Sequence, residues 1–157
     1  IKPNVYGLER ARNAGIPTFV FNAKDYSSRE AFDVVVMQKI DEFEPKLVVL
    51  AGFMRILSSP FVQHYQGHLI NIHPSLLPKF KGLNTHQRAI DAKEEMHGCS
   101  VHFVSEELDS GHIIAQMECP VTSDDDANSL QQKVHKLEHQ LYPEVISWFA
   151  EGRVRLD

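Results

Sequence analysis

Two apolar segments near the middle of the chain limit its fold more than any other feature. LVVLAG (47–52) is continuous and rich in β-branched residues, which is typical of a strand covered on both faces. HLINIH (68–73) indicates a second strand, and SSPFVQHYQG (58–67) between them predicts a short helix with a proline in its first turn. Strand, helix and strand at this spacing indicate a right-handed crossover between parallel strands. We therefore expect an α/β fold with an open, mostly parallel, twisted sheet and helices on both faces.

The residues before these strands predict further regular structure. Residues 7–14 predict a short helix, and PTFVFN (17–22) predicts a strand after it. Ser27 and Glu30 have the S-x-x-E spacing of a capping box, which satisfies free backbone N–H groups at a helix start. Apolar residues then recur at helical spacing, so we expect a helix that begins at Ser27 and ends before Pro45.

The C-terminal half predicts a change of topology. Residues 85–93 indicate a helix, and Gly98 is expected to end that segment. Residues 100–105 and 112–121 predict two strands that form an antiparallel extension of the sheet. Ser123 is expected to cap a last helix. The apolar stripe of that helix contains Leu130, Val134, Leu137, Leu141 and Val145.

Length and charge bound the class of protein. The chain has 157 residues, of which 43% are hydrophobic, so we expect one domain over residues 1–157 with one core. A formal net charge of −5 gives no basic field for a nucleic acid or an anionic membrane, and we expect neither partner. No apolar run approaches the roughly 20 residues that span a bilayer, so a cytoplasmic protein is expected.

The end of the second central strand carries Asn71 and His73. Residues two apart in a strand project from the same face, so both side chains can contact one small ligand. Pro74 disfavours helical dihedrals at His73, and Pro78 restrains the loop that follows. An imidazole can carry a proton near neutral pH and an amide offers a neutral donor, which together suit an oxyanion that forms and collapses. The alternative is that Asn71 satisfies a backbone group and His73 merely ends the strand.

EELDSG (106–111) joins the two C-terminal strands and supplies a possible third group, Asp109. Ser110 and Gly111 are turn residues that allow the backbone to bend tightly there. A carboxylate beside His73 would favour the protonated imidazole. Taken alone, Asp109 can equally be an ordinary turn aspartate.

Four strings in order carry a family resemblance. They are AGFMRILS (51–58), NIHPSLLPKFKGLNTH (71–86), GCSVHFVSEELDSGHII (98–114) and YPEVISWFAEGR (142–153). Together they resemble the phosphoribosylglycinamide formyltransferases, the folate-dependent glycinamide ribonucleotide transformylases of purine synthesis, over essentially the whole chain. N-x-H-x-S-L-L-P followed by L-D-x-G is more specific than either part. The resemblance implies a Rossmann-like formyltransferase fold.

The resemblance also implies a reaction. The amine of glycinamide ribonucleotide attacks the formyl carbon of 10-formyltetrahydrofolate directly, without a covalent enzyme intermediate and without a metal. Asn71 and protonated His73 match the residues that stabilise the tetrahedral oxyanion and move a proton toward N10. Asp109 matches the aspartate that keeps this histidine protonated and orders water.

Binding residues follow from the same comparison. Arg29 matches a folate-contacting arginine. Two segments match the walls of the folate pocket, namely Met54, Arg55, Ile56 and Leu57, and Ser105, Glu106, Glu107, Leu108 and Asp109, with Asn71 between them. His135, Lys136, Leu137 and Glu138 fall where the family binds the ribonucleotide. The family begins with a strand, a glycine-rich phosphate loop and a helix, and this sequence starts downstream of all three, so we expect an N-terminally truncated domain with weakened phosphate binding. A monomer or a homodimer is expected.

Other functions stay open at this point. Methionyl-tRNA formyltransferase and formyltetrahydrofolate deformylase share the strand-end asparagine and histidine. HKLEH (135–139) fits the H-x-x-E-H pattern of inverted zinc peptidases, with two histidines on one helix face. A third possibility is a non-catalytic module that binds folate without turnover.

Overall fold

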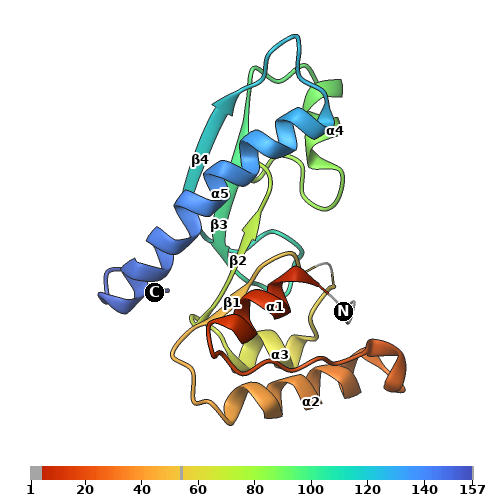
Figure 1. Cartoon of the computed structure of the whole chain (residues 1–157), viewed down its shortest axis with the longest axis vertical. Coiled ribbons are helices and arrows are strands. Elements are labelled where there is room, and N and C mark those ends of the chain that lie inside the picture. Colours follow the sequence, from red (N-terminus) through yellow and green to blue (C-terminus); the bar gives the residue numbers. More distant parts are fainter. Residues whose placement is uncertain (1–4, 54, 157) are drawn as a thin grey trace. The chain divides into compact units, whose positions relative to one another are not determined.

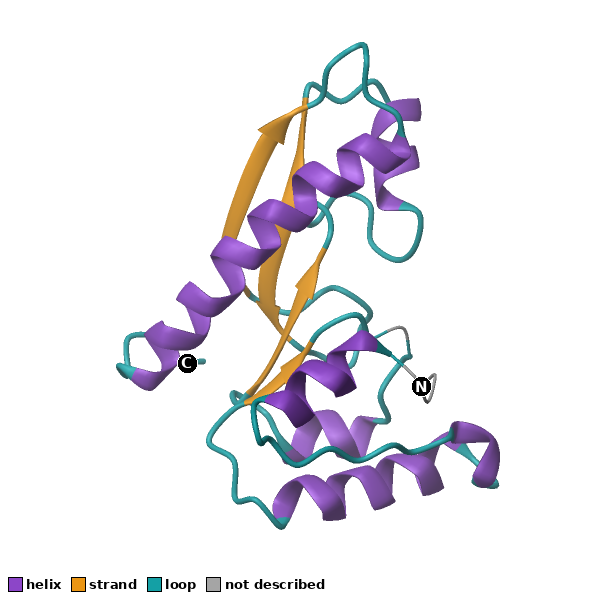
Figure 2. Ribbon diagram, in the orientation of Figure 1, coloured by secondary structure: helices purple, strands orange, loops and turns teal. Residues whose placement is uncertain are grey.

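The computed structural model describes residues 5–53 and 55–156, and the chain divides into two units, residues 1–45 and 46–157. The first unit contains helix α1 (Tyr6–Asn13), the 3-10 helix η1 (Ala23–Asp25) and helix α2 (Arg29–Asp41). The second contains β1 (Val48–Leu50), α3 (Ser59–His64), β2 (Leu69–His73), α4 (Thr85–Asp91), β3 (Met96–Phe103), β4 (Ile113–Pro120) and α5 (Ala127–Ala150). Figure 1 labels the α-helices and strands, and Figure 2 separates helices from strands. No helix among the described residues is both long enough and apolar enough to cross a membrane.

Helix α2 starts one residue later than the sequence predicted. Its N-cap is Ser28, whose Oγ accepts a hydrogen bond from the Ala31 N–H at 3.0 Å. The prediction of Ser27 is wrong, because the hydroxyl of Ser28 is the one that reaches the free backbone N–H of the first turn.

Residues 17–22 do not form the predicted strand and belong to none of the described ladders. Their apolar side chains pack without a ladder: the Phe19 ring meets the Phe43 ring edge-on, with centroids 5.8 Å apart, and Lys39 Nζ lies 4.8 Å from the Phe19 centroid. An apolar run becomes a strand only where a second backbone pairs with it, and the sequence pattern does not reveal that partner.

The second unit contains a four-stranded sheet in the order β1-β2-β3-β4. β1 and β2 are parallel, as the crossover through α3 predicted, and the β2–β3 and β3–β4 pairs are antiparallel. The α/β class and the antiparallel C-terminal extension are confirmed. The described sheet is mixed, with its parallel part at the β1–β2 end.

Strand β3 begins before Gly98, which was expected to end the preceding segment. Gly98 pairs with Glu118 of β4, and a Cβ atom at Gly98 would lie 2.0 Å from the Met117 carbonyl oxygen. The prediction is wrong because this glycine permits a close approach of two strands rather than a turn.

Helix α5 crosses β3 and β4 and covers one face of the sheet (Figures 1 and 2). Val134, Leu141 and Val145 of its predicted stripe are buried in the core cluster, and Leu137 is partly buried against it. Each fully buried aliphatic side chain of this kind contributes about 1.5–3 kcal/mol. Tyr142 was not predicted; it is buried, and its hydroxyl donates to backbone carbonyls of β1 and β2.

The cap of α5 is also displaced from its predicted position. Asp126, not Ser123, is the N-cap: its carboxylate accepts from the Ser129 N–H at 2.8 Å, and its own N–H donates to Ser129 Oγ at 3.0 Å. Asp125 instead accepts from Thr122 and lies 2.5 Å from Lys133 Nζ. A run of three aspartates offers several possible caps, and this reciprocal bonding selects one.

Candidate active site

The candidate site begins at the carboxyl end of β2, where Asn71 and His73 lie on one face of the sheet. Ile70 packs into the core cluster on the other face, together with the partly buried Ile72. Asn71 is half-buried, and His73 is 6% exposed. The alternation along the strand therefore places the two polar side chains on the side away from α5, as predicted.

The imidazole of His73 is held at both ring nitrogens. Nε2 lies 3.0 Å from the carbonyl oxygen of Phe80, and Nδ1 lies 3.5 Å from Oδ2 of Asp109. A carbonyl oxygen can only accept, so Nε2 carries a hydrogen. Because Nδ1 faces a carboxylate, the doubly protonated ring satisfies both contacts.

Asp109 is placed by two glycines from different loops. The Gly82 N–H donates to Oδ2 of Asp109 at 2.9 Å. Asp109 itself has a positive φ of 48°, and the neighbouring Gly111 lies so close to β3 that a Cβ there would be 1.6 Å from the Phe103 oxygen. The L-D-S-G turn therefore needs glycine at its last position, and it delivers the carboxylate to His73 as predicted.

His102 is a site residue that the sequence reasoning missed. It pairs with Asn71 across the β2–β3 ladder, and a bulge in the β3–β4 pairing lies beside it. Its Nδ1 lies 2.8 Å from the Phe103 carbonyl oxygen, and its Nε2 lies 3.4 Å from Nδ2 of Asn71. Burial lowers the pKa of His102, so the neutral ring accepts from the Asn71 amide. The only sequence signal for this residue was a histidine within the predicted strand SVHFVS. The sequence does not reveal which residue of β2 lies opposite it.

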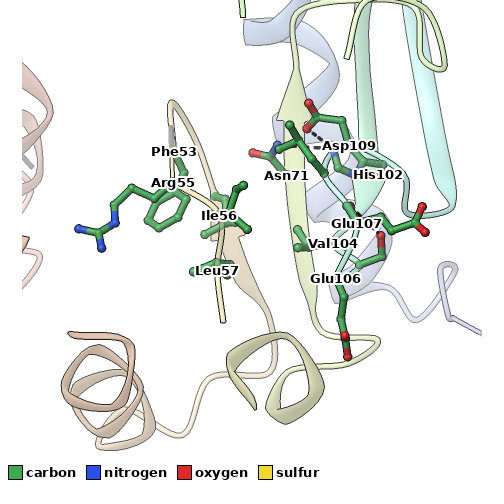
Figure 3. Close-up of a pocket in the computed structure, with 13 residues that line it drawn as sticks. Phe53, Arg55, Ile56, Leu57, Asn71, His102, Val104, Glu106, Glu107 and Asp109 are labelled. Atoms are coloured by element: carbon green, nitrogen blue, oxygen red, sulfur yellow. Dashed lines mark hydrogen bonds and ion pairs between the residues drawn. The ribbon is translucent and has the colours of Figure 1, made fainter. Parts of the chain in front are cut away.

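Asn71, His102 and Asp109 face a pocket that is open to solvent, with about 460 Å³ of empty space that includes part of this solvent (Figure 3). The predicted residues that line it are Arg55, Ile56, Leu57, Asn71, Ser105, Glu106, Glu107, Leu108 and Asp109. Leu50, Phe53, His102 and Val104 line it as well and were not predicted. The structure thus brings both predicted folate-binding segments to one pocket, with Asn71 and Asp109 in its wall. His73, whose Nδ1 lies 3.5 Å from Oδ2 of Asp109, is not a lining residue.

Two charged residues that line the pocket, Glu106 and Arg55, differ in orientation and contacts. Glu106 accepts from Gln63 Nε2 at 2.8 Å, and the hydrogen bonds from Ser59 and Gln63 lower the pKa of its carboxyl group. This bond ties the loop after β3 to helix α3. The guanidinium of Arg55 points away from Asn71 and Asp109 (Figure 3).

Two of the predicted folate-binding residues, Arg29 and Met54, are not part of the described lining. Arg29 belongs to the first unit, where its Nη2 lies 3.1 Å from Oε1 of the adjacent Glu30. Met54 lies outside the described residues. Folate binding by these two residues stays a prediction.

The predicted ribonucleotide segment lies on α5. Burial raises the pKa of the Glu138 carboxyl group, and the nearby imidazoles of His135 and His139, and least that of His73, oppose this rise. Leu137 is partly buried and packs against the core cluster. Ribonucleotide binding by His135, Lys136, Leu137 and Glu138 stays a prediction.

The zinc alternative concerns two histidines of α5. His135 and His139 lie on one helix face with ring centroids 6.4 Å apart. Across residues 5–53 and 55–156, no group of three or more histidine, cysteine, aspartate or glutamate side chains is arranged to hold a metal ion.

Side chains of strands β3 and β4 hold the loop that follows His73. Ser100, which is fully buried, donates to the Ser75 carbonyl at 2.7 Å and accepts from the Leu77 N–H at 3.0 Å. Gln116 of β4 donates to Ser100 Oγ at 2.8 Å and to the Leu77 carbonyl at 3.0 Å. Thr85 closes the loop by donating to the Pro74 carbonyl at 2.6 Å. The S-L-L-P segment is therefore held by side chains of the sheet, in addition to its prolines.

The fold and this strand-end site define a class of protein. The chain belongs to the formyl transferase family, because the sequence model of that family matches residues 1–146. Within that family it is 52% identical to the phosphoribosylglycinamide formyltransferase of Escherichia coli (strain K12), over 99% of this chain and 73% of the relative. It is also 46% identical to the human trifunctional purine biosynthetic protein adenosine-3, over 99% of this chain and 15% of that protein.

Solved structures agree with these sequence relatives. The phosphoribosylglycinamide formyltransferase of Coxiella burnetii matches with a TM-score of 0.95 and 50% identity, over 99% of this chain and 74% of that one. Glycinamide ribonucleotide transformylase 1 of Symbiobacterium toebii matches with a TM-score of 0.96 and 39% identity, over the same shares. The resemblance and the formyltransferase fold inferred from the sequence are confirmed.

Proposed function

We propose that this chain transfers the formyl group of 10-formyltetrahydrofolate to the amine of glycinamide ribonucleotide, a step of purine biosynthesis. The observation that carries the proposal is the convergence of Asn71, His102 and Asp109 on one pocket, with His73 Nδ1 3.5 Å from Oδ2 of Asp109. The similarity to glycinamide ribonucleotide formyltransferases supports the choice of substrates. A cytoplasmic location and a monomeric or homodimeric state remain predictions of the resemblance.

The reaction needs positioning and electrostatic stabilisation. The amine nitrogen attacks the formyl carbon and forms the new C–N bond, while the formyl oxygen becomes an oxyanion. Collapse of this intermediate breaks the bond between carbon and N10. The amine loses one proton and N10 gains one, so the site must stabilise one negative oxygen and carry one proton.

Asn71 is suited to the oxyanion. Its Nδ2 carries two hydrogens, and the neutral His102 accepts one of them, so that the other remains for the formyl oxygen. The bond to His102 also fixes which end of the amide is the donor. An oriented neutral donor in a partly water-excluded pocket is the usual means of stabilising such an oxygen.

His73 and Asp109 are suited to the proton. The imidazolium is held between the Phe80 carbonyl and the Asp109 carboxylate, and Asp109 extends this pair to the pocket. His73 stabilises the oxyanion through its positive charge and supplies the proton that N10 requires.

The two substrates approach from different elements in this proposal. Formyl-folate lies between the segments 55–57 and 105–109, where backbone polar groups and apolar side chains of the pocket wall can hold a pterin ring. The ribonucleotide contacts the predicted segment 135–138 of α5. Arg29 and Met54 complete the folate contacts, and His135 and Lys136 those of the ribonucleotide. No metal takes part.

The test measures loss of the formyl group from 10-formyltetrahydrofolate with and without glycinamide ribonucleotide. We expect turnover only with the ribonucleotide and a fall in kcat of about 100-fold or more for Asn71→Ala and for His73→Ala. His68→Ala is the matched control, because His68 is an exposed histidine beside the start of β2 and bonds the Lys46 carbonyl.

Other results would select other functions. Formate released without the ribonucleotide would indicate a deformylase, and transfer to methionyl-tRNA would indicate the tRNA enzyme. Folate binding without turnover would indicate a binding module. Near wild-type turnover of His73→Ala would refute the assigned role of this histidine.

A further inference from the structure

The loop of residues 79–84 makes two contacts on which the site depends. The Phe80 carbonyl accepts from Nε2 of His73 at 3.0 Å, and the Gly82 N–H donates to Oδ2 of Asp109 at 2.9 Å. The first contact orients the imidazole, and the second orients the carboxylate beside it. Any movement of this loop therefore moves both members of the proton-carrying pair.

The backbone of this loop is not one that its residues adopt readily. Phe80 has a φ of 54° and Asn84 a φ of 56°, with Gly82 at 81° between them. A bulky non-glycine residue at positive φ is held only where surrounding contacts determine it. The loop therefore needs an external anchor.

Arg88 supplies such an anchor from helix α4. One terminal nitrogen, Nη1, donates to the Lys81 carbonyl at 2.6 Å and to the Leu83 carbonyl at 3.2 Å. These two carbonyls flank Gly82 on either side. The guanidinium carbon also lies 5.4 Å from the centroid of the Phe80 ring, within the range of a cation–π contact. One side chain thus contacts the loop on both sides of Gly82 and at Phe80.

We infer that Arg88 is a positioning residue that fixes the 79–84 loop so that His73 and Asp109 keep their reacting geometry. It acts through the Phe80 carbonyl and the Gly82 N–H and touches no substrate. The kinetic part of this inference rests on the proposed formyl transfer, whereas the geometric part does not. Lysine cannot replace Arg88 fully, because a single ammonium lacks both the planar face and the forked donors.

The experiment compares Arg88→Met, Arg88→Lys and the control Gln87→Met in the full chain. Gln87 is the exposed neighbour on the same helix, and its Nε2 bonds Asp91 within that helix at 2.7 Å. Steady-state kinetics give kcat and KM, and NMR hydrogen exchange gives the protection of the Gly82 amide. The exchange measurement needs no substrate.

We expect kcat of Arg88→Met to fall about tenfold with KM for formyl-folate within about twofold, because the defect lies in positioning rather than binding. Arg88→Lys should lose about threefold, and Gln87→Met should stay within about twofold of the wild type. The Gly82 amide should exchange about tenfold faster in Arg88→Met and unchanged in Gln87→Met.

Three results would overturn the inference. They are an unchanged or increased kcat in Arg88→Met, an equal loss in Gln87→Met, and a Gly82 amide whose protection does not change when Arg88 is replaced. If the wild type transfers no formyl group, the proposed function fails, and Gly82 exchange alone then decides the inference.

Discussion

Replacement of Ser100 by alanine tests whether the sheet holds the loop that follows His73. Ser100 is fully buried, and its hydroxyl is shared by the Ser75 carbonyl, the Leu77 N–H and the Gln116 amide. In Ser100→Ala the carbonyl loses its donor and the N–H loses its acceptor, while Gln116 keeps its bond to the Leu77 carbonyl. The substitution thus leaves two buried backbone groups without these partners.

The magnitude follows from those two groups. Each buried polar group left without a partner costs about 1–3 kcal/mol, and partial relaxation of the loop places the sum at about 3 kcal/mol. With a urea slope of about 2 kcal/mol/M, the unfolding midpoint should fall by about 1.5 M. The fluorescence of Trp148 suits this assay, because it is the single tryptophan of the chain and packs against the core of the second unit.

Ser147→Ala is the matched control for this prediction. Ser147 also donates one hydrogen bond, to Glu151 at 3.1 Å, but it lies on the exposed side of α5. Its loss should change the unfolding free energy by less than about 0.5 kcal/mol. If Ser100→Ala and Ser147→Ala cost the same, the loop is not held by Ser100, and the anchoring described above is wrong.

Two further predictions concern pH and strand approach. Burial and then the neighbouring His97 lower the pKa of His86 to about 4, and burial lowers the pKa of His97, while the two rings share a hydrogen bond of 3.1 Å. Since an unfolded histidine titrates near 6.5, the unfolded chain binds more protons between about pH 6.5 and 4, so stability should fall over this range as the pH is lowered. A fully buried His86 would lose about 3 kcal/mol of unfolding free energy, and because this ring is only half-buried we expect a loss of about 1–2 kcal/mol. His86→Asn should remove most of this pH dependence, as measured by urea titrations at pH 7 and 4.5. An unchanged difference between the two pH values would contradict the assignment to His86. Gly98→Ala should destabilise the β3–β4 pair by about 3 kcal/mol, because the added Cβ would lie 2.0 Å from the Met117 oxygen. A thermal midpoint equal to that of the wild type would show that the two strands can move apart there at no cost.

The sequence predicted the centre of the site because a strand has a short and rigid period. Asn71 and His73 had to share a face, and the prolines had to restrain the exit of the strand. Asp109 required a family resemblance, since its proximity to His73 depends on how a distant hairpin packs. Nothing local in L-D-S-G specifies that packing.

The missed features all depend on pairing between distant segments. His102 and the Ser100–Gln116 anchor become visible only when the register of β3 against β2 and β4 is known. The caps of α2 and α5 were displaced because several neighbouring serines or aspartates can each cap a helix, and the hydrogen bonds of the first turn select one. Residues 17–22 show the reverse error, in which a strand-like pattern is satisfied by side-chain packing instead of a ladder.

The pairing of β2 with β3 has a consequence for how folded molecules should be counted. Ile70 lies opposite Phe103 and Ile72 opposite Val101 on the core face, while Asn71 lies opposite His102 and His73 opposite Ser100 on the other. A slip of β2 by one residue would exchange its two faces, place Asn71 and His73 against α5, and separate Asn71 from its partner His102. A misaligned molecule would therefore be unstable as well as inactive. Active fraction and correctly paired fraction become the same quantity, so specific activity after refolding should measure the fidelity of strand pairing.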